Sequence, residues 1–571
     1  MDLHTLRHSC AHVMAQAVKG LWPEVKLGIG PAIEDGFYYD FDKKEPFSDD
    51  DLGRIEEKMR QLIAGNEPLV REELSKQEAR ELFQALQEDY KLELLREIPD
   101  ATVSVYKTGE SFVDLCRGPH VTSTGEIKAF KLLSVAGAYW HGIETNPMLQ
   151  RIYGTCFQTE QELEEYLKNL EEAKTRDHRK LGPQLGFFDI YHEEAGAGLV
   201  FYHPKGALLR CIIEDYEKQE HLKRGYQMVI TPHIMQGGLW KTSGHYDYYK
   251  DNMYTFKIED KDYVVKPMNC PGHILIYKSR TRSYRELPLR FFELGTVYRH
   301  EKAGVLHGLL RVRGFTQDDA HIFCLPSQLK AEIKAVIDFV FDVMRAFGFS
   351  EVGIEFSTRP EKYIGSEEDW QQASQVLEES LQEKGLSYEV NAGEGAFYGP
   401  KIDIKLKDAL KRKWQCATIQ CDFVLPKRFN LAYVDAAGKE QQPIMLHRVI
   451  LGSIERFIGA LLEHYKADLP LWLAPTQILV IPIKESAWDY ALRVKNSLQG
   501  HCLRVEIDYR NETLDKRIRN AELSKVPYCL VLGEREAKSE TVSVRKRMSG
   551  DQGIKKLEEF IKEIKEELNK K

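Results

Sequence analysis

The stretch from residue 266 to residue 321 limits most strongly what this chain can fold into. It begins with Cys270 in a Met-Asn-Cys-Pro-Gly-His turn, continues as a strand-like run over 289–297, and ends in an acidic pair and a histidine. Arg299 and Glu301 follow the run, and side chains two positions apart on a strand point to one face. We therefore expect both to meet one ligand that is anionic at one end and donates hydrogen bonds at the other, as a nucleotide does. An isolated Arg-x-Glu pair is more often a surface ion pair, so the rest of the chain decides.

Two further segments carry related patterns. Residues 225–232 read GYQMVITP, and residues 446–457 read LHRVILGSIERF. With the stretch over 266–321, they resemble motifs 1, 3 and 2 of the class II aminoacyl-tRNA synthetases. A thiol and two imidazoles from separate segments narrow the resemblance to the threonyl-tRNA synthetases: Cys270, His321 and His447. The resemblance covers nearly the whole chain, and as a set the motifs are highly specific.

Length and composition bound the class of protein. At ~150 residues per domain, 571 residues are enough for roughly three to four domains. No apolar run is long enough to span a bilayer, and the N-terminus lacks the form of a signal peptide. Ten cysteines without a Cys-x-x-Cys pair fit free thiols in a reducing compartment. We expect a cytoplasmic protein that enters no membrane.

The charge of the chain does not by itself point to nucleic acid. Its formal net charge is -8, although the last hundred residues carry slightly more Lys and Arg than Asp and Glu. A nucleic-acid partner would therefore have to be held by local basic patches rather than by bulk charge.

The N-terminal part carries two pairs of metal-type side chains. Apolar residues at three- and four-residue steps predict an amphipathic helix over residues 2–21, with His8 and His12 one turn apart on a face away from Leu6. A Cys-x-x-x-His pair follows at Cys116. Such residues bind zinc or position a water for general-base hydrolysis, and the spacing alone does not choose between the two.

The family resemblance distinguishes zinc binding from general-base hydrolysis. It implies an editing domain that hydrolyses seryl-tRNA without a required metal, its pocket lined in part by residues 36–40. The implied editing residues are His8, His12, Lys91, Asp114, Cys116 and His120.

The organisation along the chain predicts an α+β multidomain protein. A capping box at Thr159 starts a polar helix that we expect to end at Gly182-Pro183. Irregular alternation of strands and helices then predicts an antiparallel sheet with flanking helices, as in the class II core. From Trp472 onward, strict strand–helix alternation predicts a parallel-type α/β domain. The expected parts are an editing domain over 1–160, a linker helix over 161–180, a catalytic domain over 181–470 and an anticodon-binding domain over 471–571.

The resemblance implies a two-step reaction, in which ATP and threonine form threonyl-adenylate and the amino acid then passes to tRNA(Thr). It implies that Arg299 holds the α-phosphate, Arg456 the γ-phosphate and Glu301 the adenine amino group, with Phe315 stacked on the ring. Guanidinium groups suit the charge that develops on phosphate oxygens, and Mg²⁺ would accompany ATP. The resemblance also implies that Arg311 binds ATP and that Lys401 belongs to the catalytic site. The residues that it implies for anticodon binding are Asn511, Glu536 and Arg545.

The resemblance also implies that Cys270, His321 and His447 hold one zinc ion. Three protein ligands leave zinc with open positions, which can take the amino and hydroxyl groups of threonine together. The same comparison implies that four polar residues complete the pocket: Gln317, Asp319, Tyr398 and Gln420. Valine, which lacks the hydroxyl, can be rejected by ~10⁴-fold or more.

Serine is harder to reject, because it lacks only a methyl group. A missing methyl is worth about 1–3 kcal/mol, or about 10–200-fold, so a polar first site passes too much serine. Accuracy then requires a second, hydrolytic site, which the N-terminal cluster would supply.

Two alternatives and two further expectations remain. A class II relative that charges proline or serine would lack the Cys/His/His set, and a non-catalytic RNA-binding or regulatory relative usually loses a motif arginine, whereas Arg299 and Arg456 are both present. We expect a form without the small ubiquitin-like domain that precedes editing in bacterial members. Motif 1, around Pro232, resembles the homodimer interface of the family.

Overall fold

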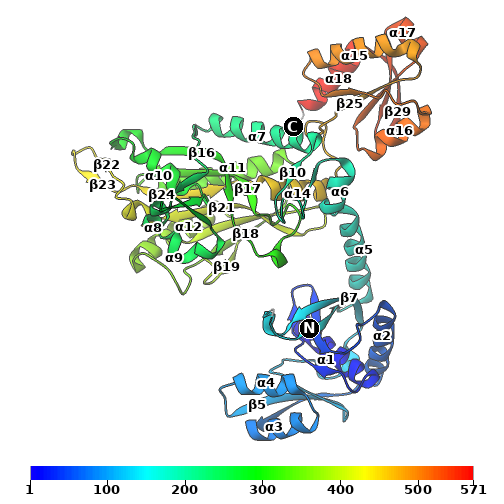
Figure 1. Cartoon of the computed structure of the whole chain (residues 1–571), viewed down its shortest axis with the longest axis vertical. Coiled ribbons are helices and arrows are strands. Elements are labelled where there is room, and N and C mark those ends of the chain that lie inside the picture. The colour runs from blue at the N-terminus through cyan, green and yellow to red at the C-terminus, as the bar shows by residue number, and fades with distance from the viewer. Residues whose placement is uncertain (1, 144, 570–571) are drawn as a thin grey trace. The chain divides into compact units, whose positions relative to one another are not determined.

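The computed structural model describes residues 2–143 and 145–569 and forms two compact units, Met1–Glu172 and Ala173–Lys571 (Figure 1). Their boundary falls inside α5 (Glu160–Arg176). The capping box predicted at its start is confirmed, since Thr159 Oγ1 accepts from the Glu162 amide at 3.2 Å.

The first unit contains two antiparallel sheets. One has the strand order β1-β3-β8-β7 with β2 beside β3, and α1 and α2 pack against it. Its elements are β1 (Lys26–Leu27), β2 (Ala32–Ile33), β3 (Gly36–Asp42), β7 (Ala129–Tyr139), β8 (Met148–Phe157), α1 (Leu3–Leu21) and α2 (Asp49–Ala64). The other has the order β4-β5-β6 with α3 and α4 beside it. Its elements are β4 (Leu69–Ser75), β5 (Thr102–Thr108), β6 (Phe112–Leu115), α3 (Lys76–Ala85) and α4 (Asp89–Glu97).

The predicted first helix exists, but its environment differs from the expectation. Asp2 caps α1 by accepting from the amides of His4 and Thr5. The helix is buried on both sides, with Leu6 1% and His12 2% exposed. The histidines therefore do not lie on a free polar face, because the neighbouring sheets cover that side of the helix as well.

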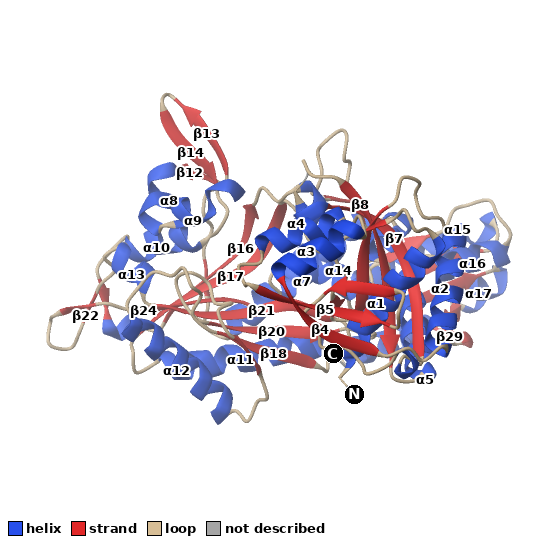
Figure 2. Cartoon of the chain, turned by 90° about the horizontal axis from the view of Figure 1, so that it is seen from below, coloured by secondary structure: helices blue, strands red, loops and turns tan. Residues whose placement is uncertain are grey.

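The second unit is built on an eight-stranded sheet of order β11-β16-β17-β24-β21-β20-β18-β19. Only the two edge pairings are parallel, so the predicted antiparallel sheet is confirmed. Its strands are β11 (Gln227–Met228), β16 (Leu289–Tyr298), β17 (Gly314–Cys324), β18 (Val352–Ser357), β19 (Glu389–Asn391), β20 (Lys401–Lys407), β21 (Lys413–Asp422) and β24 (Ile444–Val449). Four helices share its apolar core (Figure 2): α7 (Pro204–Lys223), α11 (Leu329–Ala346), α12 (Glu367–Glu383) and α14 (Ile454–Tyr465).

Smaller elements surround this sheet. A three-stranded sheet of order β12-β14-β13 projects from it (Figure 2), and short strands pair as β10-β9 and as β15-β22-β23. The strands are β9 (Phe188–Asp189), β10 (Phe201–Tyr202), β12 (Ile234–Gln236), β13 (Tyr254–Ile258), β14 (Lys261–Val265), β15 (Arg282–Ser283), β22 (Tyr433–Val434) and β23 (Glu440–Gln441). The helices are α6 (His178–Leu185), α8 (Gly237–Ser243), α9 (His245–Tyr249), α10 (Cys270–Lys278) and α13 (Val424–Arg428).

Two sequence expectations in this unit are wrong. The polar helix does not end at Gly182-Pro183, because α5 ends at Arg176 and α6 continues through Pro183 to a left-handed cap at Gly186, where φ is 71°. Arg299 and Glu301 do not lie on a strand, because β16 ends at Tyr298 and both follow it in a loop.

The last domain has the order β26-β25-β27-β28-β29. Its strands are β25 (Ile478–Pro482), β26 (Val505–Ile507), β27 (Tyr528–Leu532), β28 (Thr541–Lys546) and β29 (Gly550–Lys556). β25 pairs in parallel with β26 and β27, as predicted for a parallel-type α/β domain, and β28 and β29 extend one edge of the sheet in antiparallel pairing. α15 (Trp488–Gly500) and α18 (Leu557–Leu568) share one core with the sheet, and α16 (Leu514–Leu523) packs in another; α17 (Glu534–Ser539) is a further short helix.

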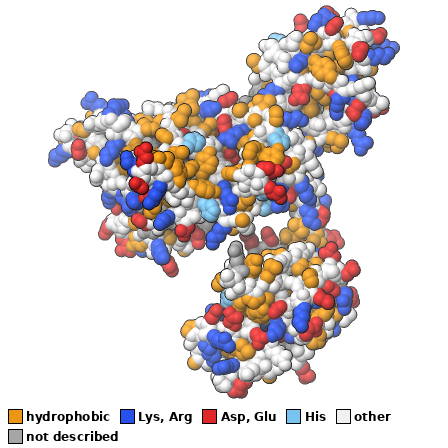
Figure 3. All heavy atoms as spheres, in the orientation of Figure 1, with side chains coloured by type: hydrophobic (Ala, Val, Ile, Leu, Met, Phe, Trp, Pro, Cys, Tyr) orange, Lys and Arg blue, Asp and Glu red, His pale blue; other side chains and the backbone are white. Residues whose placement is uncertain are grey.

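On the faces that Figure 3 shows, acidic and basic side chains are interspersed, without a large surface of one sign. Among the helices in the described part of the chain, none is long and apolar enough to cross a membrane.

One side chain of β17, that of Asp318, holds a turn in the core. Asp318 faces the core, and its carboxylate accepts the amides of Ile450, Leu451 and Gly452 at 2.6 to 3.1 Å. These three residues form the turn that leads to Ser453, the N-cap of α14. A buried carboxylate thus supplies the hydrogen bonds that the turn cannot make within itself.

We expect Asp318→Ala to destabilise the second unit by roughly 3 kcal/mol or more, because each buried amide left without an acceptor costs about 1–3 kcal/mol. Calorimetry of the full chain measures the thermal transition that belongs to this unit. Asp318→Asn, which keeps one acceptor oxygen, should cost less than the alanine variant. Equal and small shifts for both variants would contradict the role assigned to this carboxylate.

Candidate active sites of the two units

The register of the large sheet brings four predicted site residues into one row. His321 on β17 lies opposite His447 on β24, His447 lies opposite Gln420 on β21, and Gln420 lies opposite Lys401 on β20. Directly opposite residues share a face of the sheet. Four strands, β17, β20, β21 and β24, therefore supply one surface.

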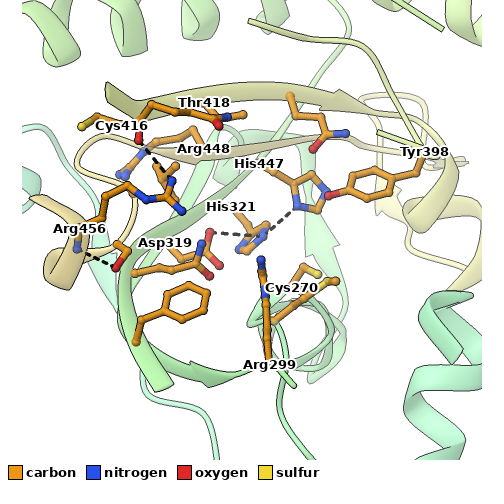
Figure 4. Close-up of a pocket in the computed structure, with 18 residues that line it drawn as sticks. Cys270, Arg299, Asp319, His321, Tyr398, Cys416, Thr418, His447, Arg448 and Arg456 are labelled. Carbon is orange, nitrogen blue, oxygen red and sulfur yellow. Dashed lines mark hydrogen bonds and ion pairs between the residues drawn. The ribbon is translucent and has the colours of Figure 1, made fainter. Parts of the chain in front are cut away.

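Cys270 joins this row from the start of α10. Ligand atoms of Cys270, His321 and His447 all lie within 4.8 Å of one another, and the three residues are at most 8% exposed. His321 Nε2 and His447 Nδ1 face each other at 3.0 Å (Figure 4). The structure thus gathers the three residues that were predicted to hold a metal.

The protonation of these groups fits a bound zinc ion. His447 Nε2 lies 2.8 Å from Asp422 Oδ2, which accepts from it, so in the metal-binding tautomer Nδ1 points its lone pair at His321. Burial lowers the pKa of His321 well below its ordinary value, so the His321 ring is neutral. A buried sulfur and two imidazole nitrogens are a donor set that zinc prefers.

A cavity of about 330 Å³ opens beside these residues. Its lining includes the other residues predicted to bind threonine: Gln317, Asp319, Tyr398 and Gln420. Asn269 fixes one of them by donating to Asp319 Oδ2 at 3.0 Å. Gly295 permits this contact, since a Cβ there would lie 2.4 Å from the Asn269 amide.

A second cavity, of about 610 Å³, shares Arg299, Phe315 and Arg456 with the first. Glu301 and Arg311 also line it, and Arg311 pairs with the Glu301 carboxylate at 3.0 Å. All five residues predicted to bind ATP therefore border one cavity, although Arg299 and Glu301 reach it from a loop.

Arg456 has no carboxylate partner among the described residues. Its Nε donates to the Leu310 carbonyl at 3.1 Å. The helical neighbours that might have paired with it are engaged elsewhere, Glu455 with Arg210 and Glu463 with His178. Burial, and then the charges of nearby arginines, lower the pKa of Arg456, so an anion in this cavity would relieve an uncompensated positive charge.

Other predicted residues lie apart from these linings. The Lys401 ammonium lies 2.7 Å from Asp403 and lines neither cavity. In the last domain, Asn511 follows β26 in an exposed loop, Glu536 lies on α17, and Arg545 lies on β28. Their roles in tRNA binding remain predictions.

His245 is a residue near the site that the sequence did not reveal. It starts α9, and its ring lies 6.2 Å from that of Tyr398. Its Nε2 is buried without a hydrogen-bond partner among the described residues. Burial, and then the charges of His447 and Arg299, lower the pKa of His245 to about 3. It stands alone in sequence, so no spacing pointed to it.

The first unit gathers all six predicted editing residues. Cys116 Sγ lies 3.3 Å from His8 Nε2 and 3.2 Å from His120 Nε2. The rings of His12 and His120 are 4.1 Å apart. Beside them, the Lys91 ammonium lies 2.5 Å from Asp114 Oδ1.

Tyr39 connects this ion pair to the sheet, because its hydroxyl donates to Asp114 at 2.5 Å and accepts from Lys91 at 2.9 Å. It lies in the 36–40 segment that was expected to line the pocket. A cavity of about 560 Å³ adjoins the cluster, with Cys116 and Arg117 in its lining.

Burial keeps the cluster uncharged. It lowers the pKa values of His8, His12 and His120 and raises the pKa of the Cys116 thiol to about 11. Neutral imidazoles can take a proton from water, whereas a protonated thiol is a poor nucleophile. Neutral imidazoles and a cysteine also suit a metal ion, and ligand atoms of His8, His12, Cys116 and His120 lie within 4.8 Å of one another. The arrangement is therefore compatible with both chemistries that the sequence left open.

Three family models match parts of the chain. The tRNA synthetase class II core domain (G, H, P, S and T) matches residues 254–465, and an anticodon binding domain matches 477–567. The threonyl and alanyl tRNA synthetase second additional domain matches 103–153. The sheet and its paired cavities, with these matches, define the chain as a class II aminoacyl-tRNA synthetase, and the predicted fold class is confirmed.

The chain is 56% identical to threonine–tRNA ligase from Oleidesulfovibrio alaskensis over 98% of its length and 86% of that relative. It is 57% identical to the enzyme from Pelobacter propionicus, over 99% and 88% of the two chains. A crystal structure of the RNA binding domain of threonyl-tRNA synthetase from Cryptosporidium parvum Iowa II superposes with a TM-score of 0.66 at 42% identity, over 68% of this chain and 98% of that one. The chain belongs to the threonine–tRNA ligase family, which confirms the predicted family and enzyme class.

The lowered pKa values in the editing cluster predict a pH-dependent stability of the first unit. Below about pH 6.5, the three histidines take up protons when the chain unfolds but not while it is folded, so stability falls as the pH falls. Calorimetry between about pH 7 and about pH 5 should show the transition of this unit moving to lower temperature. His120→Asn, which cannot titrate, should make that dependence shallower. An unchanged dependence in this variant would contradict the assignment of a neutral ring.

Proposed function

We propose that this chain joins threonine to tRNA(Thr) in two steps at the paired cavities of its second unit. The observation that carries the proposal is that the metal-type cavity and the arginine-lined cavity share Arg299, Phe315 and Arg456. An amino acid in one would thereby meet a nucleotide in the other. Attack of its carboxylate on the α-phosphate gives the adenylate and pyrophosphate.

Cys270, His321 and His447 would hold zinc in this scheme. When bound, the ion supplies a Lewis acid for the amino and hydroxyl groups of threonine. The chain's own carboxylate at Asp319, held by Asn269 and 3.8 Å from His321 Nε2, orients the amino group beside the predicted metal ligands.

The arginines act on the nucleotide. Arg299 stabilises the charge that develops at the α-phosphate, and Arg456 binds the γ-phosphate. The Arg299 guanidinium carbon lies 5.1 Å from the centre of the Phe315 ring. Phe315 stacks with adenine, and Glu301 accepts from the adenine amino group. Mg²⁺ accompanies the triphosphate, as phosphate chemistry of this type requires.

In the first unit, the cluster around Cys116 hydrolyses seryl-tRNA(Thr). Its neutral imidazoles take the proton of the attacking water, and the buried Lys91–Asp114 pair holds the groups in place. The adjoining cavity of about 560 Å³ leaves room for the end of the tRNA.

The chain would act as a homodimer in the cytoplasm. Large apolar side chains stand exposed along α7 and motif 1, with Ile230 at 87% and Leu222 at 55%. A second copy of the chain would cover them. All ten cysteines are free, which suits a reducing compartment.

We expect the purified chain to contain about one zinc ion, and Cys270→Ser to remove it together with threonine activation. ATP–pyrophosphate exchange, measured with threonine, serine, valine and proline separately, checks the function. Threonine and, more weakly, serine should support exchange, whereas valine should be slower by ~10⁴-fold or more. Cys502→Ser is the matched control, because Cys502 is exposed and follows α15 in the last domain, away from the predicted ligands and the proposed dimer surface. Full threonine-dependent exchange in metal-free protein would overturn the metal role.

A separate prediction concerns editing. His8→Ala with His12→Ala should leave exchange with threonine and serine unchanged, because neither residue lines the paired cavities. Deacylation of preformed Ser-tRNA should fall by about 10²-fold or more, the usual contribution of general-base catalysis. His4→Ala, on the exposed start of the same helix, is the control. If the double variant clears Ser-tRNA as fast as its parent, the cluster is not the hydrolytic site.

A further inference from the structure

A line of buried polar groups leads away from His321 and borders none of the cavities described above. His321 Nδ1 lies 2.8 Å from His273 Nδ1, and His273 Nε2 lies 3.1 Å from Glu293 Oε2. Glu293 in turn accepts from the Lys266 ammonium at 3.1 Å and from the Thr231 amide at 2.8 Å. The last four of these residues are at most 4% exposed.

Such a line needs an explanation other than stability. Taking a lysine and a glutamate out of water costs several kcal/mol per ion, and a buried pair often contributes nothing net. Apolar side chains of the same size would pack this interior at lower cost. The presence of these polar groups therefore indicates a role in holding a neighbouring side chain in position.

For neutral imidazoles, the hydrogen bonds fix where each proton lies. The Glu293 carboxylate can only accept, so His273 carries its proton on Nε2 and presents the lone pair of Nδ1. That lone pair accepts from His321 Nδ1, which places the second lone pair of His321 on Nε2, the atom that faces His447. The line thus sets the one tautomer of His321 that can bind a metal at the predicted centre.

We propose that His273 and Glu293 form a positioning relay, which holds His321 in its metal-binding tautomer and anchors the metal centre to motif 1 through Thr231. The inference rests on the proposed zinc site. For His447, a single hydrogen bond to the Asp422 carboxylate has the same role. Each imidazole is therefore oriented through the ring nitrogen that faces away from the metal site. Groups of this kind typically change metal affinity by about 10–100-fold when they are removed.

The test compares two substitutions at one position in the full-length chain. A glutamine amide at residue 273 can accept from His321 through its oxygen and donate to Glu293 through its nitrogen, whereas leucine has similar size and can do neither. We expect His273→Leu to weaken zinc binding by about 10–100-fold and His273→Gln to stay within a few-fold of the parent. Competition between the protein and a chromophoric zinc chelator measures the affinity.

Thermal unfolding of the metal-free chains separates this role from a purely structural one, which would lower the stability of His273→Leu without zinc. Thr231→Val provides a second variant, because it removes the hydroxyl that donates to Glu293 at 2.9 Å and touches no predicted ligand. It should weaken zinc binding in the same direction by a few-fold. Parent-like zinc affinity in both His273→Leu and Thr231→Val would overturn the relay alone. A parent chain that binds no zinc would overturn the proposed metal centre and the relay with it.

Discussion

The antiparallel pairing of β17 with β16 and β24 is the constraint on which both cavities depend. Alternate residues of this strand face opposite sides. Phe315, Gln317, Asp319 and His321 face the cavities, whereas Asp318 faces the core and holds the turn before α14. A shift of the strand register by one residue would exchange its two faces. The cavity residues would then be buried, and Asp318 would point away from the turn before α14. The strand pairs along its length on one side with β16, and β24 adds a second row of partners.

That register also explains why the site is assembled from distant segments. His321 reaches His447 because the two lie opposite each other across the sheet, although 126 positions separate them. Cys270 depends on the same pairing, since its helix packs over β16 and β17 in one apolar cluster. The chemistry of the centre is therefore a property of tertiary pairing, and the local sequence supplies only the residue types.

Much of the fold followed from local patterns. The amphipathic helix predicted over residues 2–21 is α1 (Leu3–Leu21), and the strand-like run over 289–297 lies in β16 (Leu289–Tyr298). Local patterns failed where long-range pairing decides. The chain turns away from β17 after Arg299, because the His300 amide donates to the Asn252 carbonyl and the Glu301 amide to the Arg299 carbonyl, both at 2.9 Å. In the last domain, β29 forms by folding back on β28.

The site was predicted in a similar way. Its residue types came from a resemblance to a family, and the structure brings most of them together around the expected cavities. The residues behind them were not predictable from spacing. Asp318 and Glu293 act on groups 134 and 62 positions away, at contacts that exist only in the folded sheet.

The two Cys/His clusters use the same residue types for different tasks, and their surroundings account for the difference. The Asp422 carboxylate accepts from His447 Nε2, which keeps the proton on that nitrogen and directs the lone pair of Nδ1 toward the predicted metal site. His12 of the first unit has a buried Nδ1 without a hydrogen-bond partner among the described residues. A ring whose outer nitrogen is held acts as a fixed ligand, whereas a ring without such a partner can exchange its proton. On the proposed roles, the cluster of Cys270, His321 and His447 in the second unit selects an amino acid by the polar groups that threonine and serine share, so it cannot separate the two by more than a methyl allows. The imidazoles of the first unit, which act as a base, can then hydrolyse the seryl-tRNA that the threonine site has failed to reject.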